Sequence, residues 1–243
     1  MELVATRITG AARDTLARQI DQFVGEDKRR RARRCRDFME SLRILTADAL
    51  LRGILAERLA TSPRTLGFAR NAYGKPYVVG TSAIHFNVSH SCEWVVVAVA
   101  ESEVGVDVQY MGDVDLAPLT RQLHSHEQVR LARLEGAAKQ QCFYAIWTAK
   151  EGYVKAVGRG LAESFSRFWV QEKPDRTIGI WTDAGCNDRW GCAQQPFADG
   201  YVLTVCTRVG ESLEARVRWI LVDQLAPWLA GLEAAHGKVG AQR

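Results

Sequence analysis

The sequence predicts an α+β protein with two subdomains of similar size, and the order of its elements is the main reason. The first half shows apolar residues at helical spacing and then a period of two, which is typical of strands. The second half repeats this order, with helical segments before a cluster of strands. We therefore predict a first subdomain over residues 1–109 and a second over residues 110–243, which ends in a C-terminal extension.

The elements of the first half follow from these two periods. Leu3–Ala5 predict a short strand, and apolar spacing predicts helices over residues 12–24 and 37–60. Ser89–Cys92 is predicted to form a turn between two strands. Alternation predicts four strands, over residues 77–79, 84–88, 94–100 and 104–109.

The second half begins with a mixed stretch and then contains two helices, predicted over residues 126–134 and 138–157. Gly158-Arg159-Gly160 is expected to close the longer helix. The last segment holds a strand-like stretch over residues 217–221 and then a helix. Further strands are predicted over residues 165–171, 177–181, 190–194 and 201–207.

Composition and charge exclude several classes of protein. A hydrophobic fraction of 47% excludes disorder as the dominant state, because such a chain can bury enough apolar surface to offset its ordering entropy. No apolar run approaches the ~18 residues that span a bilayer, and the N-terminus lacks the pattern of a secretory signal. The six cysteines are scattered without metal-binding spacing, so we expect free thiols in a reduced, cytoplasmic protein.

Asp107 and Gln109 are candidate metal ligands. They alternate with apolar residues in the predicted strand 104–109, so both side chains point to one face, roughly 6–7 Å apart along the strand. Carboxylate and amide oxygens suit a hard cation such as Mg²⁺. The alternative interpretation is a half-exposed strand with a polar face.

The predicted helix 138–157 carries a second candidate pair. Glu151 and Lys155 are four residues apart and therefore share a helix face. The carboxylate could bind a metal or accept a proton, while the ammonium could neutralise a phosphate oxygen. The alternative is a surface ion pair that contributes little to stability.

Two further clusters could bind anions. Ser89 and His90 follow a predicted strand, where a hydroxyl, an imidazole and turn amides suit a phosphate, although a capped polar turn would show the same residues. No Gly-x-Ser-x-Gly motif supports a serine nucleophile there. Residues 28–36 place seven cations in nine positions and lead into an amphipathic helix. Most such runs are solvated or bind nucleic acid, but some of these side chains could reach a bound phosphate.

Four motifs in this order and spacing resemble the Sfp-type 4'-phosphopantetheinyl transferases of the broad-specificity bacterial kind. They are Gly74-Lys75-Pro76, Phe86–Ser91, Val104–Val108, and Trp147–Glu151 with Lys155–Leu161. The resemblance implies a pseudo-twofold pair of similar α/β subdomains with the active site between them, usually in a monomer. It also implies a holo-[acyl-carrier-protein] synthase, which moves the phosphopantetheine arm of coenzyme A onto a carrier-protein serine and releases 3',5'-ADP.

The resemblance assigns roles to individual residues. Asp107 and Glu151 match Mg²⁺ ligands, and Glu151 is also the best candidate to deprotonate the carrier serine, directly or through a water. Lys155 would stabilise charge on the transferring and leaving phosphates. The residues that match contacts to the phosphates of coenzyme A are Lys28, Arg31, Lys75, Ser89, His90 and Lys155.

The chain departs from the family pattern at two places. Many members have Glu where Gln109 stands, and a neutral amide is a poorer Mg²⁺ ligand, so Gln109 would bind through water or not at all. The family's Phe-Phe-Ser-x-x-Glu stretch is here Gln122–Glu127, in which Ser125 could cap the helix but the hydrophobic lead-in is missing. The expected partners are acidic acyl, aryl or peptidyl carrier proteins of fatty acid, polyketide or nonribosomal peptide synthesis, with no nucleic acid or membrane.

Three alternatives stay open. A nucleic-acid-binding protein could use the basic run 28–36, but this would leave His90, Asp107 and Glu151 unexplained. A carrier-binding homologue without catalysis is suggested only by Gln109. A metal-dependent nucleotide hydrolase is possible in principle, and no motif favours it.

Overall fold

The computed structural model describes residues 1–9, 13–159 and 164–237 of the chain. The elements of its first half are strand β1 (Glu2–Arg7), helix α1 (Arg13–Ile20), the 3₁₀ helix η2 (Asp21–Phe23), helices α2 (Glu26–Arg34) and α3 (Phe38–Leu59), and strands β2 (Phe68–Arg70), β3 (Pro76–Val78), β4 (His85–Ser91), β5 (Trp94–Ala100) and β6 (Val104–Tyr110). The predicted strand over residues 94–100 is confirmed at both ends. The basic run forms most of a separate helix, α2, because Asp37 caps a new helix and accepts a hydrogen bond from Met39 N.

The second half contains a longer run of strands around one long helix. Its elements are helices α4 (Ala117–Thr120), α5 (Ser125–Ala132) and α6 (Gly136–Val157), the 3₁₀ helix η4 (Phe165–Arg167), strands β7 (Trp169–Glu172), β8 (Ile178–Thr182), β9 (Gly185–Gln195), β10 (Tyr201–Arg208) and β11 (Val217–Trp219), and helix α7 (Val222–His236). The strand predicted over residues 165–171 begins instead with η4. The closing motif of α6 is only partly visible, since Gly160 and Leu161 lie outside the described residues.

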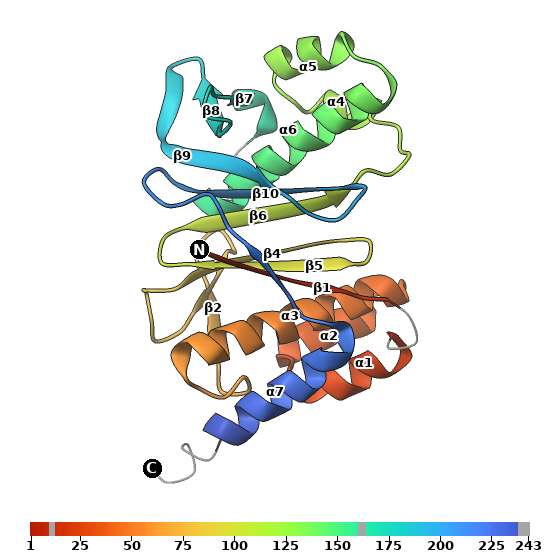
Figure 1. Cartoon of the computed structure of the whole chain (residues 1–243), viewed down its shortest axis with the longest axis vertical. Helices are drawn as coiled ribbons and strands as arrows, with labels where there is room; N and C mark the ends of the chain where they lie inside the picture. The colour runs from red at the N-terminus through yellow and green to blue at the C-terminus, as the bar shows by residue number, and fades with distance from the viewer. Residues whose placement is uncertain (10–12, 160–163, 238–243) are drawn as a thin grey trace.

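Two sheets form the centre of the molecule, and the predicted α+β class is confirmed. The first sheet has the strand order β11-β1-β5-β4 and the second β6-β10-β9-β8-β7. Figure 1 shows helices α1, α2, α3 and α7 toward one end and α4, α5 and α6 toward the other. The two 22-residue helices, α3 and α6, supply large parts of two apolar cores, one in each half.

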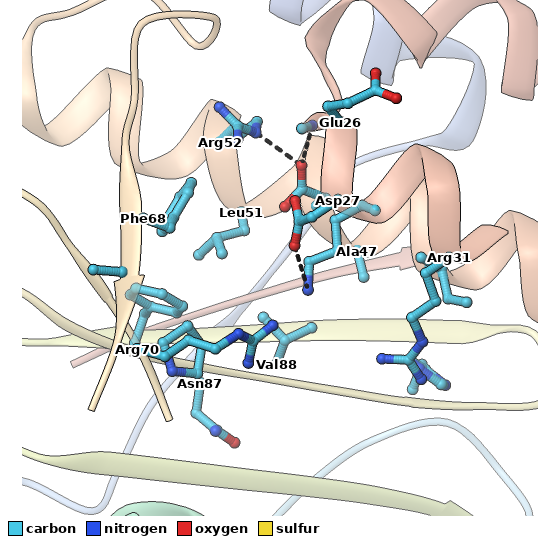
Figure 2. A pocket seen from close by; sticks show the side chains of 18 residues that line it. Glu26, Asp27, Arg31, Ala47, Leu51, Arg52, Phe68, Arg70, Asn87 and Val88 are labelled. Carbon is cyan, nitrogen blue, oxygen red and sulfur yellow. Dashed lines mark hydrogen bonds and ion pairs between the residues drawn. The ribbon is translucent and has the colours of Figure 1, made fainter. Parts of the chain in front are cut away.

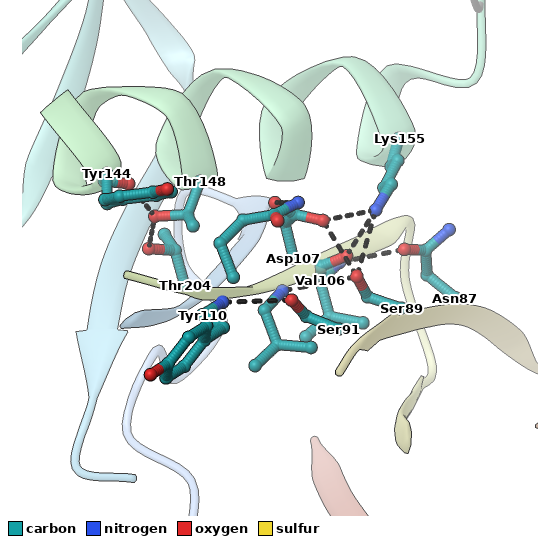
Figure 3. Close-up of polar contacts among 12 residues, drawn as sticks. Asn87, Ser89, Ser91, Val106, Asp107, Tyr110, Tyr144, Thr148, Lys155 and Thr204 are labelled. Atoms are coloured by element: carbon teal, nitrogen blue, oxygen red, sulfur yellow. Dashed lines mark hydrogen bonds and ion pairs between the residues drawn. The ribbon is translucent and has the colours of Figure 1, made fainter. Parts of the chain in front are cut away.

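The two sheets meet where β4 runs beside β6, and side chains join them. Alternate polar side chains of β4 accept hydrogen bonds from alternate backbone N–H groups of β6, so no strand-to-strand ladder forms between them. The bonds run from Val106, Val108 and Tyr110 N to Asn87 Oδ1, Ser89 Oγ and Ser91 Oγ, at 3.0, 3.2 and 2.9 Å (Figure 3). We call this contact the β4–β6 junction.

The junction corrects the prediction of a turn over Ser89–Cys92. Ser89 and His90 lie inside strand β4, which continues to Ser91, and Cys92 alone of these four residues enters the turn. The polar side chains that suggested a turn serve instead as acceptors for β6. The polar residues of β4 are therefore explained by the hydrogen bonds that they make to β6.

The C-terminal extension returns to the first half of the molecule. Strand β11 pairs in parallel with β1, and α7 packs on α3. A Cβ on Gly53 would lie 2.2 Å from the Trp228 ring, so only glycine admits this contact. The predicted division at residues 109 and 110 falls within β6, and residues 217–236 lie with the N-terminal core. Within the part of the chain that the structure describes, no helix combines the length and apolarity needed to cross a membrane.

Candidate active site at the β4–β6 junction

Asp107 lies at the centre of the candidate site. Its side chain is 1% exposed on β6, and Lys155 Nζ lies 2.6 Å from its Oδ1 atom. The Ser89 hydroxyl donates to the same oxygen at 2.8 Å and accepts the Val108 N–H (Figure 3). A buried carboxylate needs such partners, because desolvation of an unpaired charge is costly. Residues from β4, β6 and α6 therefore meet at one point.

Gly105 explains why α6 comes so close to β6. A Cβ on Gly105 of β6 would lie 2.0 Å from the carbonyl oxygen of Gly152 and 2.5 Å from Ala156 N. Such distances are excluded by van der Waals contact, so any side chain at position 105 would push the helix away. The close approach places Lys155 of α6 within reach of Asp107.

Glu151 lines the same site from α6. Burial raises the pKa of Glu151; the Lys155 ammonium acts against this shift, and the negative charge of Asp107 adds to it. Glu151 and Lys155 both line a cavity of about 780 Å³. This cavity is bordered by Trp147 and Phe165, so an apolar chain could lie beside the two charged groups.

Gln109 also reaches Asp107, as the alternation of the strand predicts. Its amide Nε2 donates to Asp107 Oδ2 at 3.2 Å. Within the described residues, no group of three or more His, Cys, Asp or Glu side chains could hold a metal. The oxygen donors in this region are the two carboxylates of Asp107 and Glu151 and the amide oxygen of Gln109. This set fits Mg²⁺, which takes one or two carboxylates and keeps several waters.

A second cavity, of about 410 Å³, adjoins the first and contains the basic candidates. Lys28, Arg31 and His90 line it, and Pro76 and Asn87 line both cavities (Figure 2). Burial lowers the pKa of His90, against the opposing effect of the Glu40 carboxylate, so the imidazole is neutral near pH 7. Among the described residues, the wall of this cavity carries four cations against three carboxylates, because Arg52, Arg70, Glu26, Asp27 and Asp48 line it as well. We call it the basic cavity.

Lys75 lies at the wall of the larger cavity, but its ammonium faces the protein. Its Nζ donates to the carbonyl oxygens of Ala156 at 2.8 Å and Val104 at 3.2 Å. Burial lowers the pKa of Lys75 to about 8, and the Glu103 carboxylate partly opposes this. A phosphate contact by Lys75 stays a prediction, and it would require the ammonium to leave at least one of these carbonyls.

The sequence analysis missed a buried ion pair beside the site. Lys150 Nζ lies 2.6 Å from Glu127 Oε2, with side chains 0% and 3% exposed. Lys150 also donates to the carbonyls of Phe165 and Phe168, and Glu127 accepts the Val170 N–H. Burial lowers the pKa of Lys150 and raises that of Glu127. The pair connects α5 and α6 to the segment Phe165–Phe168, which borders the larger cavity. The one sequence signal for this ion pair is that Lys150 directly precedes Glu151.

The structure thus separates the predicted residues into two groups. The first group surrounds the β4–β6 junction and contains Ser89, Asp107, Gln109, Glu151 and Lys155. The second lines the basic cavity and contains Lys28, Arg31 and His90. The other arginines of the basic run do not line it; Arg29, for example, bonds Glu26 and Asp21.

Comparisons with known proteins show which proteins this chain resembles. A family model described as the 4'-phosphopantetheinyl transferase superfamily matches residues 103–206, and one for the N-terminal part of a 4'-phosphopantetheinyl transferase matches residues 14–102. A crystal structure of a holo-(acyl-carrier-protein) synthase from Bacillus anthracis in complex with CoA (3',5'-ADP) covers 44% of this chain and 95% of that chain, at 18% identity and a TM-score of 0.38.

Two relatives show similarity over longer stretches. The 4'-phosphopantetheinyl transferase gsp of Aneurinibacillus migulanus is 31% identical over 155 residues, which cover 64% of this chain and 65% of that protein. The 4'-phosphopantetheinyl transferase psf-1 of Bacillus pumilus is 31% identical over 192 residues, which cover 78% of this chain and 81% of that protein. With a match of this extent, and with two family models that together span residues 14–206, the chain belongs to the 4'-phosphopantetheinyl transferase family.

Proposed function

We propose that this protein transfers the 4'-phosphopantetheine arm of coenzyme A to a serine hydroxyl of apo carrier proteins and releases 3',5'-ADP. One observation carries the proposal. Asp107, Glu151 and Lys155 meet beside a cavity of about 780 Å³, and the basic cavity adjoins it. A substrate with an anionic nucleotide at one end and a long, mostly apolar arm at the other matches these two cavities.

The chemistry requires neutralisation of charge more than covalent catalysis. The serine oxygen forms a bond to the phosphorus that carries the pantetheine arm, and the bond from this phosphorus to the bridging oxygen of the pyrophosphate breaks. Glu151 takes the serine proton, a role to which its raised pKa is suited. Lys155 offsets the negative charge that develops on the leaving 3',5'-ADP.

A metal ion belongs to the same proposal. Asp107 and Glu151 would hold Mg²⁺, with Gln109 as a neutral oxygen donor or a contact through water. The bound ion supplies positive charge to the pyrophosphate oxygens. In the structure Lys155 Nζ lies 2.6 Å from Asp107 Oδ1, so an ammonium group already accompanies this buried carboxylate.

The partners are acidic acyl, aryl or peptidyl carrier proteins. The chain has a net charge of +4, and a basic enzyme gains association rate with an acidic partner by electrostatic steering. Our proposal includes action as a cytoplasmic monomer on carriers of fatty acid, polyketide or nonribosomal peptide synthesis.

The decisive experiment is intact-mass analysis of an apo carrier protein incubated with this protein, coenzyme A and Mg²⁺. We expect the carrier to gain one phosphopantetheine group. A carrier that binds but keeps its mass would favour the non-catalytic homologue instead. A salt-sensitive gel shift with random DNA, in the absence of transfer, would favour the nucleic-acid alternative.

Gln109 provides a sharper test of the metal site. We predict that Gln109→Glu lowers the Mg²⁺ concentration for half-maximal rate by about fivefold, equivalent to roughly 1 kcal/mol, because an added carboxylate attracts the cation. We also predict that Gln109→Ala is tolerated better than Asp107→Ala, since Asp107 accepts hydrogen bonds from both Lys155 and Ser89. Mg²⁺ titration of the transfer rate of all three variants beside the parent measures both effects. Equal damage from the two alanine variants would make Gln109 a required ligand or substrate contact.

A further inference from the structure

We propose that the buried ion pair between Asp48 and Arg52 is a positioning device that sets the spacing of the basic cavity, so that Lys28 and Arg31 face the 3'-phosphate of coenzyme A. This inference rests on the proposed function, because it assumes that the basic cavity holds the nucleotide end of coenzyme A. Neither Asp48 nor Arg52 belongs to a motif that the sequence singled out.

The pair lies on α3, one helical turn apart, at the wall of the basic cavity. Arg52 Nε donates to Asp48 Oδ2 at 2.8 Å, and the side chains are 9% and 4% exposed, respectively. Both residues line the cavity, and Figure 2 labels Arg52 at its wall. A carboxylate beside an anion site repels the anion, and the Arg52 guanidinium offsets the charge of Asp48 at this position.

One arm of the network reaches the start of α2. Gly25, the N-cap residue of α2, donates its N–H to Asp48 Oδ2 at 2.8 Å. Lys28 and Arg31 follow Gly25 at intervals of three residues, so they lie on one side of the helix that begins at this anchor. The direction in which α2 leaves Asp48 therefore decides where the two cations lie.

The other arm reaches the opposite wall. Arg52 Nη1 donates to the carbonyls of Pro63 at 3.1 Å and Leu66 at 3.0 Å, in the loop after α3. The guanidinium also lies over the Phe68 ring, 5.0 Å from its centre, and Phe68 lines the basic cavity. The same ion pair thus fixes the start of α2 and the start of β2 relative to α3.

The close fit of Gly25 to this network supplies an independent observation. A Cβ at position 25 would lie 2.8 Å from Arg52 Nη2 and 3.0 Å from Asp27 Oδ1. The guanidinium is held by three acceptors and cannot move aside without losing some of them. A side chain at position 25 would therefore shift α2 outward, and Lys28 and Arg31 with it, without removing any charge from the chain.

Two variants separate positioning from simple electrostatics. Asp48→Asn removes a negative charge from the wall, and electrostatics alone would then tighten the binding of a phosphate. Positioning predicts the opposite, because the anchor of α2 is weakened. Gly25→Ala keeps all charges and tests the spacing alone. Glu57→Gln is the matched control, since Glu57 also lies on α3 and pairs with an arginine, Arg218, outside the basic cavity.

The measurement is the dissociation constant of the full-length protein for coenzyme A and for dephospho-coenzyme A, by titration calorimetry. In Asp48→Asn and Gly25→Ala, we expect affinity for coenzyme A to fall about tenfold, the loss of a charge-assisted contact, and affinity for dephospho-coenzyme A to change less than twofold. In Glu57→Gln, the ratio of the two constants should equal that of the parent even if thermal stability falls.

Three results would overturn the inference: tighter binding of coenzyme A by Asp48→Asn, equal weakening of both ligands in Gly25→Ala, or a parent that does not distinguish the two ligands. Gly25→Ala still decides the matter if Asp48→Asn does not fold. Because the readout is binding, a parent that binds coenzyme A but transfers nothing would refute the proposed function and leave this test intact.

Discussion

Glu151→Gln is expected to lower the turnover of phosphopantetheine transfer by at least about 100-fold, the usual effect of removing a general base. Glutamine keeps the shape of the side chain but cannot take the proton of the carrier serine. It also removes one of the two carboxylates beside Lys155, which weakens any metal bound there. The raised pKa of Glu151 and its position on the wall of the larger cavity are the reasons for this choice of base.

Turnover should be measured at saturating Mg²⁺, so that a weaker metal site does not account for the loss. Glu135→Gln is the matched control, because Glu135 lies at the start of the same helix and is exposed. It should transfer at the parental rate. A normal rate in Glu151→Gln would remove this residue from the mechanism and leave water or the carrier itself as the proton acceptor.

Lys150→Met is expected to lower the free energy of unfolding by about 3–5 kcal/mol, the cost of leaving one partner of a buried ion pair uncompensated. The Glu127 carboxylate would then remain buried, with only backbone donors for its charge. Denaturant unfolding measures the loss. The segment Phe165–Phe168 would also lose its anchor, so the border of the larger cavity would loosen.

A double variant tests the pairwise nature of this effect. Glu127→Gln with Lys150→Met removes both charges, so the double variant should be less destabilised than the sum of the two single variants. Strict additivity would show that the two side chains act independently. Lys139→Met, a change of the same kind at a less buried position of α6, should have little effect.

Local sequence pattern predicted which side chains share a face of a strand better than it predicted the contacts that these side chains make. Alternation in β6 correctly indicated that Asp107 and Gln109 share a face, because the period of a strand is fixed by its backbone. The ion pair between Asp107 and Lys155 joins residues 48 positions apart. It depends on the close approach of Gly105 to α6, a packing contact that no local period encodes.

The contacts that local pattern did not predict have a common physical cause. Serine is common in turns, yet Ser89 lies in strand β4. Its hydroxyl accepts the Val108 N–H of β6 in place of a backbone carbonyl. Lys75 belongs to a motif that suggests a phosphate contact, which stays a prediction, and its bonds to two carbonyls from distant segments were not indicated by that motif. In each case, the partner of a polar group decides its role, and that partner is defined only after folding.

The β4–β6 junction has a consequence for how this protein can change by mutation. The hydrogen bonds of a backbone ladder form whatever the side chains are. Each of the three bonds across this junction instead depends on the identity of one residue of β4. A substitution at Asn87 or Ser91 would leave one N–H of β6 without its acceptor and would weaken the β4–β6 junction by one hydrogen bond. Ser89 differs from both, because its hydroxyl accepts the Val108 N–H across the junction and also donates to Asp107. One oxygen atom therefore contributes both to the cohesion of the two halves and to the hydrogen bonding of the carboxylate at the centre of the site.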